Sequence, residues 1–234
     1  MVNLVDIGST IISQSQRRVE VAGQNVANIA TPGYKKQAVF ASLLPPDTLS
    51  ADRFARQDVY TDYSPGRPIV TGNPFDLAIA GEGFFAVRAD EQILYTRQGQ
   101  FQRQGDGRVV TADGFALQTR GGGDLVLKGG DFKVTEDGTV VENGEPVAKL
   151  ALSRFIDPRT ANHAQGGAFS SADANVREVD VPSVRQGSIE ASNVSTGDEM
   201  VTMMEALRRA ESGQRVVNVY DDLMGRALSA FGGQ

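Results

Sequence analysis

The 234-residue sequence contains no cysteine, no tryptophan and a single histidine, His163. Without cysteine the chain can form no disulfide, offers no thiolate to a metal and has no cysteine nucleophile. One histidine leaves little material for a zinc site or for a nucleophile activated by a general base. We therefore expect no catalytic residues, no metal and no cofactor. The lack of cysteine is compatible with either an oxidising or a reducing compartment.

Long runs of one chemical character are missing too. The net charge is −6 and like charges are not clustered in runs, which argues against nucleic acid or anionic lipid as the main partner, because either calls for a basic face. The N-terminal residues carry no basic segment, and their apolar residues are spaced rather than continuous. We expect neither a cleaved signal peptide nor direct membrane insertion, and any export should follow a route that cuts no leader.

The sequence does contain apolar periodicity at both ends. From about Leu4 to Ile29 and from about Asp198 to Phe231, apolar residues recur at three- and four-residue steps, which predicts two long amphipathic helices. The second frame holds one charged residue, Asp221. A central β body is poorly placed to cover such stripes, so they indicate assembly rather than catalysis. The predicted helical seam is Leu4, Ile7, Ile11, Val26, Met200, Met203, Leu207, Val217, Met224, Leu228 and Phe231.

Local signals mark where these helices begin and end. The first should stop at Thr31-Pro32-Gly33, where Gly33 can take the positive φ of a sharp exit. A substitution of Gly33 is expected to disturb assembly and not the stability of the β domain. The second helix has two overlapping capping-box frames, Thr196 with Glu199 and Ser195 with Asp198. Three acid–base pairs with four-residue spacing predict an exposed side: Glu205–Arg209, Glu211–Arg215 and Asp222–Arg226.

Between the helices the sequence is typical of strands and turns. Residues 31–70 are predicted to be an extended connector, and residues 71–194 a central antiparallel β domain. Asp-Gly pairs at 106–107, 113–114 and 137–138 predict type I′ hairpin turns. Residues 157–173 should be a loop, followed by one more strand within 176–188. The expected strands are Leu77–Ala80, Phe84–Arg88, Ile93–Arg97, Arg108–Thr111, Phe115–Thr119, Leu125–Leu127, Phe132–Thr135, Thr139–Glu142 and Val147–Phe155.

The predicted fold is therefore α+β, with the long N- and C-terminal helices pairing as a coiled-coil-like layer, an extended connector and a central antiparallel all-β domain. The helical domain is discontinuous and comprises residues 1–30 and 195–234. At about 1.5 Å per residue, the second helix should be roughly 50 Å long.

Three stretches then point to a family. Asn25 to Lys36 read NVANIATPGYKK, which resembles the signature of flagellar basal-body rod proteins: two asparagines three apart, then a small residue, glycine, an aromatic and a basic residue. Residues 71–85, TGNPFDLAIAGEGFF, with Tyr95-Thr96-Arg97, and residues 187–194, GSIEASNV, are similar to other parts of rod and hook subunits. The resemblance covers both ends and the centre, so it is more specific than any single motif.

The resemblance implies a structural subunit of the flagellar axis. Its partners would be copies of itself and other rod and hook proteins, and it would be exported unfolded by the flagellar type III apparatus to assemble in the periplasm. The compact length is most similar to proximal rod subunits, then to distal ones, and less to hook subunits. The subunit-interaction residues carried by the motifs are Asn25, Asn28, Thr31, Gly33, Tyr34, Lys36, Glu190, Ser192, Asn193 and Val194.

The residue chemistry gives these positions roles. The amides of Asn25 and Asn28 can bond carbonyls left without partners at a helix end. Tyr34 can fill a neighbour's pocket, while Lys35 or Lys36 meets an acid. A plain capped helix end followed by a turn is the alternative.

Two other classes of function stay open. A secreted peptidoglycan-acting enzyme would need a carboxylate pair, since cysteine is absent and histidine is single, and no pair stands out in the sequence. A generic secreted β-domain binder would explain the centre but not the helical ends.

Overall fold

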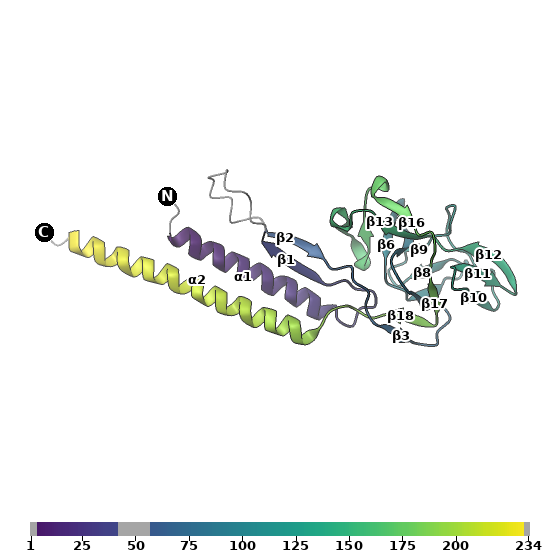
Figure 1. Cartoon of the computed structure of the whole chain (residues 1–234), viewed down its shortest axis with the longest axis horizontal. Helices are drawn as coiled ribbons and strands as arrows, with labels where there is room; N and C mark the ends of the chain where they lie inside the picture. The colour runs from purple at the N-terminus through teal and green to yellow at the C-terminus, as the bar shows by residue number, and fades with distance from the viewer. Residues whose placement is uncertain (1–3, 42–56, 232–234) are drawn as a thin grey trace. The chain divides into compact units, whose positions relative to one another are not determined.

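The computed structural model describes residues 4–41 and 57–231, and they divide between two compact units. The helical unit comprises residues 1–27, 37–62 and 194–234, and the β unit comprises residues 28–36 and 63–193. Each unit is therefore assembled from segments that are distant in sequence (Figure 1). The predicted α+β class, with paired terminal helices and an antiparallel β centre, is confirmed.

The elements of the two units have the following bounds. The helices are α1 Leu4–Ala27 and α2 Thr196–Phe231, with short 3-10 turns η2 Pro158–Thr160, η3 Gln165–Gly167 and η4 Asp173–Asn175. The strands are β1 Gln37–Ala41, β2 Gln57–Thr61, β3 Pro68–Val70, β4 Leu77–Ile79, β5 Phe84–Ala89, β6 Gln92–Thr96, β7 Phe101–Arg103, β8 Val109–Thr111, β9 Ala116–Leu117, β10 Phe132–Val134, β11 Thr139–Glu142, β12 Glu145–Lys149, β13 Leu152–Phe155, β14 Asn162–His163, β15 Phe169–Ser170, β16 Val176–Glu178, β17 Val184–Gln186 and β18 Ser188–Glu190.

In the helical unit, α1 and α2 pack as an antiparallel pair through small residues. Gly8, Ser15 and Ala22 of α1 are buried at seven-residue spacing, as are Ala206 and Gly213 of α2. A Cβ placed on Gly213 would lie only 3.0 Å from the Gly8 carbonyl oxygen, so the two backbones touch at this point. Small residues every seven positions keep one face of each helix narrow, and this allows the close approach.

Part of the predicted seam lies in that contact. The half-buried residues Val217, Ile11 and Met203 face Gly8, Gly213 and Gly23 of the opposite helix, and Val26 is half-buried as well. The other members are exposed, namely Leu4, Ile7, Met200, Leu207, Met224 and Leu228, and Phe231 is the last residue of α2. The exposed apolar side chains stay available to other partners.

The ends of the helices differ in detail from the expectation. α1 ends at Ala27, and α2 begins at Thr196 in the alternative capping frame, with Ser195 Oγ accepting from the Asp198 amide at 3.5 Å. Of the three expected acid–base pairs on α2, the described residues form only Asp222–Arg226, at 4.0 Å. Exposed pairs of this kind contribute little, so side-chain entropy can outweigh them.

The predicted connector is divided between the units. β1 and β2 pair antiparallel, with Val39 opposite Val59, and this hairpin lies against α1 in the helical unit (Figure 1). Residues 63–70, which include β3, belong to the β unit. Residues 42–56, including Leu43 and Leu44 of the expected connector, lie outside the described part.

The β unit is built on a sheet in the order β14-β15-β6-β5-β9-β8-β7, with β13 pairing β5 and β16. β10, β11 and β12 form a meander beside two shorter pairs, β17 with β4 and β18 with β3. One apolar core fills the unit, and its largest fully buried members include Phe85, Leu77, Leu117, Leu125 and Leu152. A second, aromatic cluster consists of Phe84, Tyr95, Phe155 and Phe169, with Tyr63 packed edge-on against three of these rings.

The turn type predicted for the Asp-Gly pairs is wrong. Gly107, Gly114 and Gly138 have positive φ, but the aspartates before them do not. The Gly138 amide donates to the Thr135 carbonyl and the Thr135 amide to the Thr139 carbonyl, which is the pattern of a type I turn closed by a glycine bulge. A pair of successive positive φ values, as a type I′ turn requires, occurs instead at Asn143-Gly144 between β11 and β12.

Other differences arise where pairing partners are distant in sequence. The expected loop 157–173 contains β14 and β15, and the single strand expected within 176–188 is replaced by β16, β17 and β18. Pro182 and Gly187, the latter at φ 73°, separate these three strands. Leu125–Leu127 forms only an isolated bridge through Val126, and Val147–Phe155 is interrupted at Leu150.

Replacing Gly213 with leucine should push α1 and α2 apart, because the new side chain would meet the Gly8 carbonyl and Ile11. We expect a loss of about 1–3 kcal/mol in the stability of the helical unit, as is usual for overpacking. The control is Gly225→Leu in the same helix, where a Cβ meets nothing within 4 Å. That variant should gain up to about 0.8 kcal/mol from helix propensity. Urea unfolding followed by helical circular dichroism measures both, and equal behaviour of the two variants would contradict the close packing.

Candidate functional site

The three family-like stretches come together in the β unit around one carboxylate, that of Glu190 at the end of β18. Glu190 Oε1 accepts from Lys35 Nζ at 2.5 Å and from the Gly66 amide at 2.8 Å. Its other oxygen, Oε2, accepts from Arg97 Nη1 at 2.9 Å. Lys35 comes from the first stretch, Arg97 from the second and Glu190 from the third. We call Lys35, Arg97 and Glu190 the buried ion cluster.

Both cations of this cluster are also bound to backbone carbonyls. Lys35 Nζ donates to the Ser64 carbonyl at 2.8 Å. Arg97 donates to the Ile79 carbonyl at 3.3 Å and to the Gly81 carbonyl at 2.5 Å. The cluster therefore holds the backbone at Ser64, before β3, and at the end of β4. It also joins the three segments that contain Lys35, Arg97 and Glu190.

Water is almost completely excluded from the cluster. Lys35, Glu190 and Arg97 are 1%, 3% and 4% exposed. Burial lowers the pKa of the Arg97 guanidinium from its ordinary value, and the Glu190 carboxylate counteracts that effect. The Phe84 ring, 5.4 Å from Arg97 Cζ, adds a cation–π contact. Removing one partner from such a group leaves an uncompensated buried charge, which costs far more than an exposed ion pair gains.

The turn after α1 reaches this cluster through Gly33. Its φ is +70°, as predicted, and its amide donates to the Glu190 carbonyl at 2.8 Å. An added Cβ would lie 2.3 Å from the Arg97 carbonyl carbon, so only glycine fits against this backbone. Because Gly33 is part of the β unit, its substitution is now expected to lower the stability of the β domain as well as to disturb assembly.

Asn193 ties the same turn to the third stretch. Its Oδ1 accepts from the Lys36 amide at 2.7 Å, and its Nδ2 donates to the carbonyl and the hydroxyl of Ser64, at 3.2 Å each.

The other residues of the first stretch also bond within the chain. Asn28 Oδ1 accepts from the Thr31 hydroxyl at 3.3 Å, and Tyr34 is buried within its own chain. Tyr34 therefore has little exposed surface left for the expected contact with a neighbouring subunit.

Asn25 lies in the helical unit and is fully buried there. Its side chain exchanges two hydrogen bonds with the backbone of Gln37 in β1, at 2.7 and 2.9 Å, and donates to Glu199 Oε2 at 3.1 Å. The amide thus bonds both a strand and α2. Asn25 and Glu199 are a buried polar contact inside an otherwise close-packed helix pair, and such contacts can fix the register of helices.

The structure groups the predicted residues into two sets. Gly33, Tyr34, Lys36, Glu190 and Asn193 meet around the ion cluster, with Asn28, Thr31 and Ser192 in the adjoining segments of the β unit. Asn25 and Val194 belong to the helical unit. Of the two lysines expected to meet an acid, Lys35 pairs with Glu190. Arg97 is a site residue that the sequence did not indicate, although it stands inside a quoted stretch, because sequence alone does not show which basic residue is buried.

The arrangement fits a structural role better than catalysis or metal binding. Among residues 4–41 and 57–231, no group of three or more histidine, aspartate or glutamate side chains is placed to hold a metal ion. The His163 ring packs against the Phe169 ring at a tilt of 56°, with centroids 4.8 Å apart. Neither described helix has a stretch apolar enough to span a membrane.

Three models of flagellar protein families match this chain, and together they overlap the three stretches. The model of the flagellar hook protein FlgE/F/G D1 domain matches residues 78–197, which is more than half of the chain. The chain belongs to the flagellar rod and hook family. Two further models match the ends: the flagella basal body rod protein at residues 9–35 and the flagellar basal body rod FlgEFG protein C-terminal at residues 185–230.

Relatives within the family extend over nearly the whole chain. The flagellar basal-body rod protein FlgF of Salmonella typhimurium is 30% identical over 92% of each chain, and FlgF of Caulobacter vibrioides is 29% identical over 99% of each. FlgG of Agrobacterium fabrum is 28% identical over 93% of this chain and 95% of its own. The protein is thus a flagellar rod protein of the FlgF or FlgG kind.

Neutralising Glu190 should destabilise the β unit strongly. In Glu190→Gln two cations stay buried without their carboxylate, and we expect a loss of about 3–5 kcal/mol. Glu178→Gln is the matched control, because Glu178 pairs with Arg120 at 2.6 Å where both side chains are nearly half exposed. It should cost no more than about 1 kcal/mol. Denaturant unfolding measures the free energy of unfolding of both variants. A similarly small loss in both would contradict a structural role for the buried ion cluster.

A methyl group at Gly33 should also weaken the β unit. Gly33→Ala combines a positive φ with a clash against the Arg97 backbone, for an expected loss of about 2–5 kcal/mol. Gly72→Ala separates the two effects, since Gly72 has φ +76° but nothing within 4 Å of its Cβ position. The control should lose roughly 1–2 kcal/mol. Thermal unfolding of both would show whether the close approach matters beyond backbone strain.

Proposed function

We propose that this protein is a structural subunit of the bacterial flagellar basal-body rod, assembled with copies of itself and with other axial proteins through its terminal helices. The observation that carries the proposal is the unpartnered apolar surface of the helical unit. Leu207, Met200 and Met204 are each more than half exposed, and so are Val219 and Leu223. Such side chains on a folded helix indicate further packing partners.

The geometry of α2 strengthens this argument. At 3.6 residues per turn, Leu207 is about 100° around the helix from Ala206, which faces α1. α2 therefore has a face for its own chain and apolar residues on other sides. It also continues past the first described residue of α1 (Figure 1). Large apolar residues of a helix normally pack against another element, so those outside the face that meets α1 indicate neighbours that one chain does not supply.

A peptidoglycan-acting enzyme is the competing class. It would need a general acid and a second carboxylate in one cleft. The acid at the centre of the three family-like stretches, Glu190, is buried and bound by two cations, so it cannot reach a polysaccharide substrate. Purified protein should therefore leave a peptidoglycan zymogram uncleared, and clearing that is lost with a carboxylate variant would favour the enzyme.

Within the rod we propose the proximal, FlgF-like position. The FlgF relatives are 29–30% identical to the chain, and the FlgG relatives 25–28%. Electron micrographs of basal bodies from a deletion strain test this choice. Loss of the rod from its proximal part onward supports it, whereas a proximal stub that lacks only the distal rod would favour FlgG.

Export by the flagellar type III apparatus and assembly in the periplasm complete the proposal. The test is whether a tagged copy reaches the basal body only when the export apparatus is intact. Mass spectrometry of the N-terminus from purified basal bodies then reports whether a leader has been cut.

Charge on the exposed apolar face should block assembly without unfolding the chain. Leu207 is 54% exposed, so Leu207→Lys should change the stability of the isolated protein by less than about 0.5 kcal/mol. In a subunit interface the same lysine would be buried without a partner, which is costly. Cells should export the variant but be non-motile.

The control for that experiment is Leu207→Met, which keeps the apolar contact and should support motility. If cells that carry Leu207→Lys were motile, this face of α2 would be exposed to solvent in the assembled rod, and the proposed interface would be contradicted.

A further inference from the structure

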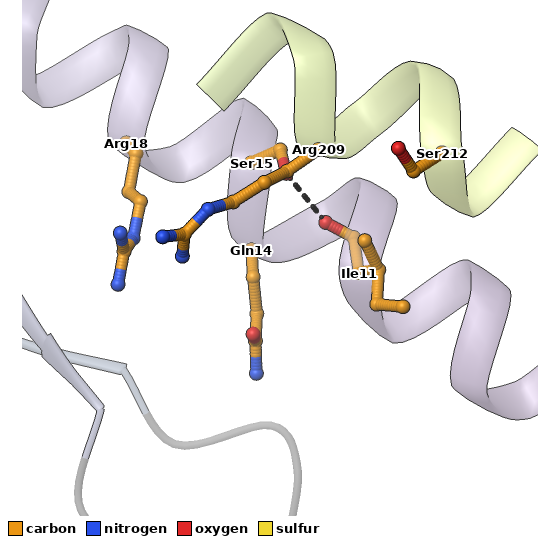
Figure 2. A pocket seen from close by; sticks show the side chains of 6 residues that line it. All are labelled: Ile11, Gln14, Ser15, Arg18, Arg209 and Ser212. Atoms are coloured by element: carbon orange, nitrogen blue, oxygen red, sulfur yellow. Dashed lines mark hydrogen bonds between the residues drawn. The ribbon is translucent and has the colours of Figure 1, made fainter. Parts of the chain in front are cut away.

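The helical unit contains a hollow of about 290 Å³ between α1 and α2 in which two arginines converge. Arg18 of α1 and Arg209 of α2 line it together with Gln14, and Ile11 and Ser15 are among the other lining residues (Figure 2). The Ser15 hydroxyl is already used within α1, where it donates to the Ile11 carbonyl at 2.8 Å. The polar groups that remain at the mouth are therefore mainly the two guanidinium groups.

Neither arginine forms an ion pair with any residue in the described part of the chain. Arg209 has Glu205 four residues before it, at the spacing that predicts a helical ion pair, yet that pair does not form. Instead, Arg209 lines the same hollow as a second cation, Arg18. Two like charges in one hollow repel each other, and a carboxylate placed between them gains from both.

A carboxylate that needs such a site is present on the same protein. Asp221 stands four residues after Val217 and three before Met224, within the apolar frame of α2, and it too has no ion-pair partner among the described residues. This stretch continues the face that meets α1, because Val217 packs against Gly8 while residues 221–230 are all exposed. If another copy covers this stretch, Asp221 is buried with it and requires a cation.

The two sites cannot meet within one chain. Arg209 and Asp221 are twelve residues apart on one continuous helix, which separates them by about 18 Å along its axis. Any contact between them must therefore join two copies.

Building on the proposed self-assembly, we infer that Asp221 of one copy binds in the Arg18–Arg209 hollow of a second copy. The partner is a carboxylate on an apolar helix, and the planar arginine groups suit it. This ion pair would fix the axial offset between neighbouring α2 helices, because the apolar residues around it would pack at more than one offset while a buried charge would not.

Thiol cross-linking tests the contact directly, because the chain has no cysteine of its own. Two differently tagged copies, one Arg209→Cys and the other Asp221→Cys, are expressed together in the deletion strain. Purified basal bodies are then treated with a bismaleimide about as long as an arginine–aspartate pair. We expect a cross-linked dimer that carries both tags. Arg208→Cys with Asp221→Cys is the matched control, since Arg208 does not line the hollow, and should give at least about tenfold less dimer.

Charge reversal gives a second readout that does not depend on cysteine. Asp221→Arg and Arg209→Asp should each lower motility by about tenfold or more, as expected when one partner of a buried pair is lost. The double variant should recover most of it. Arg208→Asp and Asp222→Arg, on neighbouring positions of α2, should change motility less than about twofold, as exposed charges do.

The possible outcomes separate this inference from the proposed function. If the wild-type copy restores motility and enters basal bodies but no dimer forms and charge reversal is not rescued, self-assembly stands and the Asp221 contact is overturned. A cross-link only to a different axial protein also overturns it. If the wild-type copy neither enters basal bodies nor restores motility, the proposed function itself fails.

Discussion

The Glu190 carboxylate lies between two cations and a backbone amide with almost no access to water, and the rest of the β unit is arranged around that constraint. Lys35 and Arg97 cannot be buried without Glu190, and Glu190 cannot be buried without them. Since the three residues come from the beginning, middle and end of the chain, the cluster makes their burial interdependent. The turn that follows α1 is consequently a structural part of the β unit and not a loose linker.

The helical unit follows a different physical rule. Its internal contact is centred on small residues such as Gly8 and Gly213, with Val217 and Ile11 packed against them, so the pair gains close approach at the expense of hydrophobic burial. Larger residues such as Leu207 are left outside this contact. In a protein that acts as a monomer, apolar residues left exposed in this way would contribute little to the stability of the fold. In the assembly proposed above, this arrangement leaves the exposed apolar surface of α2 for contacts with other subunits.

The sequence predicted the features that depend on local signals. The two long helices, the glycine exit at Gly33 and the β character of the centre follow from periodicity and turn chemistry. It did not predict the hydrogen bond between Lys35 and Glu190, which are 155 residues apart, because no local pattern encodes so distant a partner. The small-residue seam was also missed, since a search for large apolar side chains passes over glycine and serine. The turn type at Asp137-Gly138 failed for a similar reason: the dipeptide suits both geometries, and the length of the loop decides between them.

Native-state hydrogen exchange on the purified chain tests the central claim most directly. The amides of Gly33 and Lys36, bonded to Glu190 and Asn193, should exchange in one cooperative unit with core strand amides such as those of β5. Their protection should fall together as denaturant is added. If the amides of residues 28–36 exchanged rapidly while β5 stayed protected, this turn would be separable from the β unit, and the account of a fold organised around Glu190 would be contradicted.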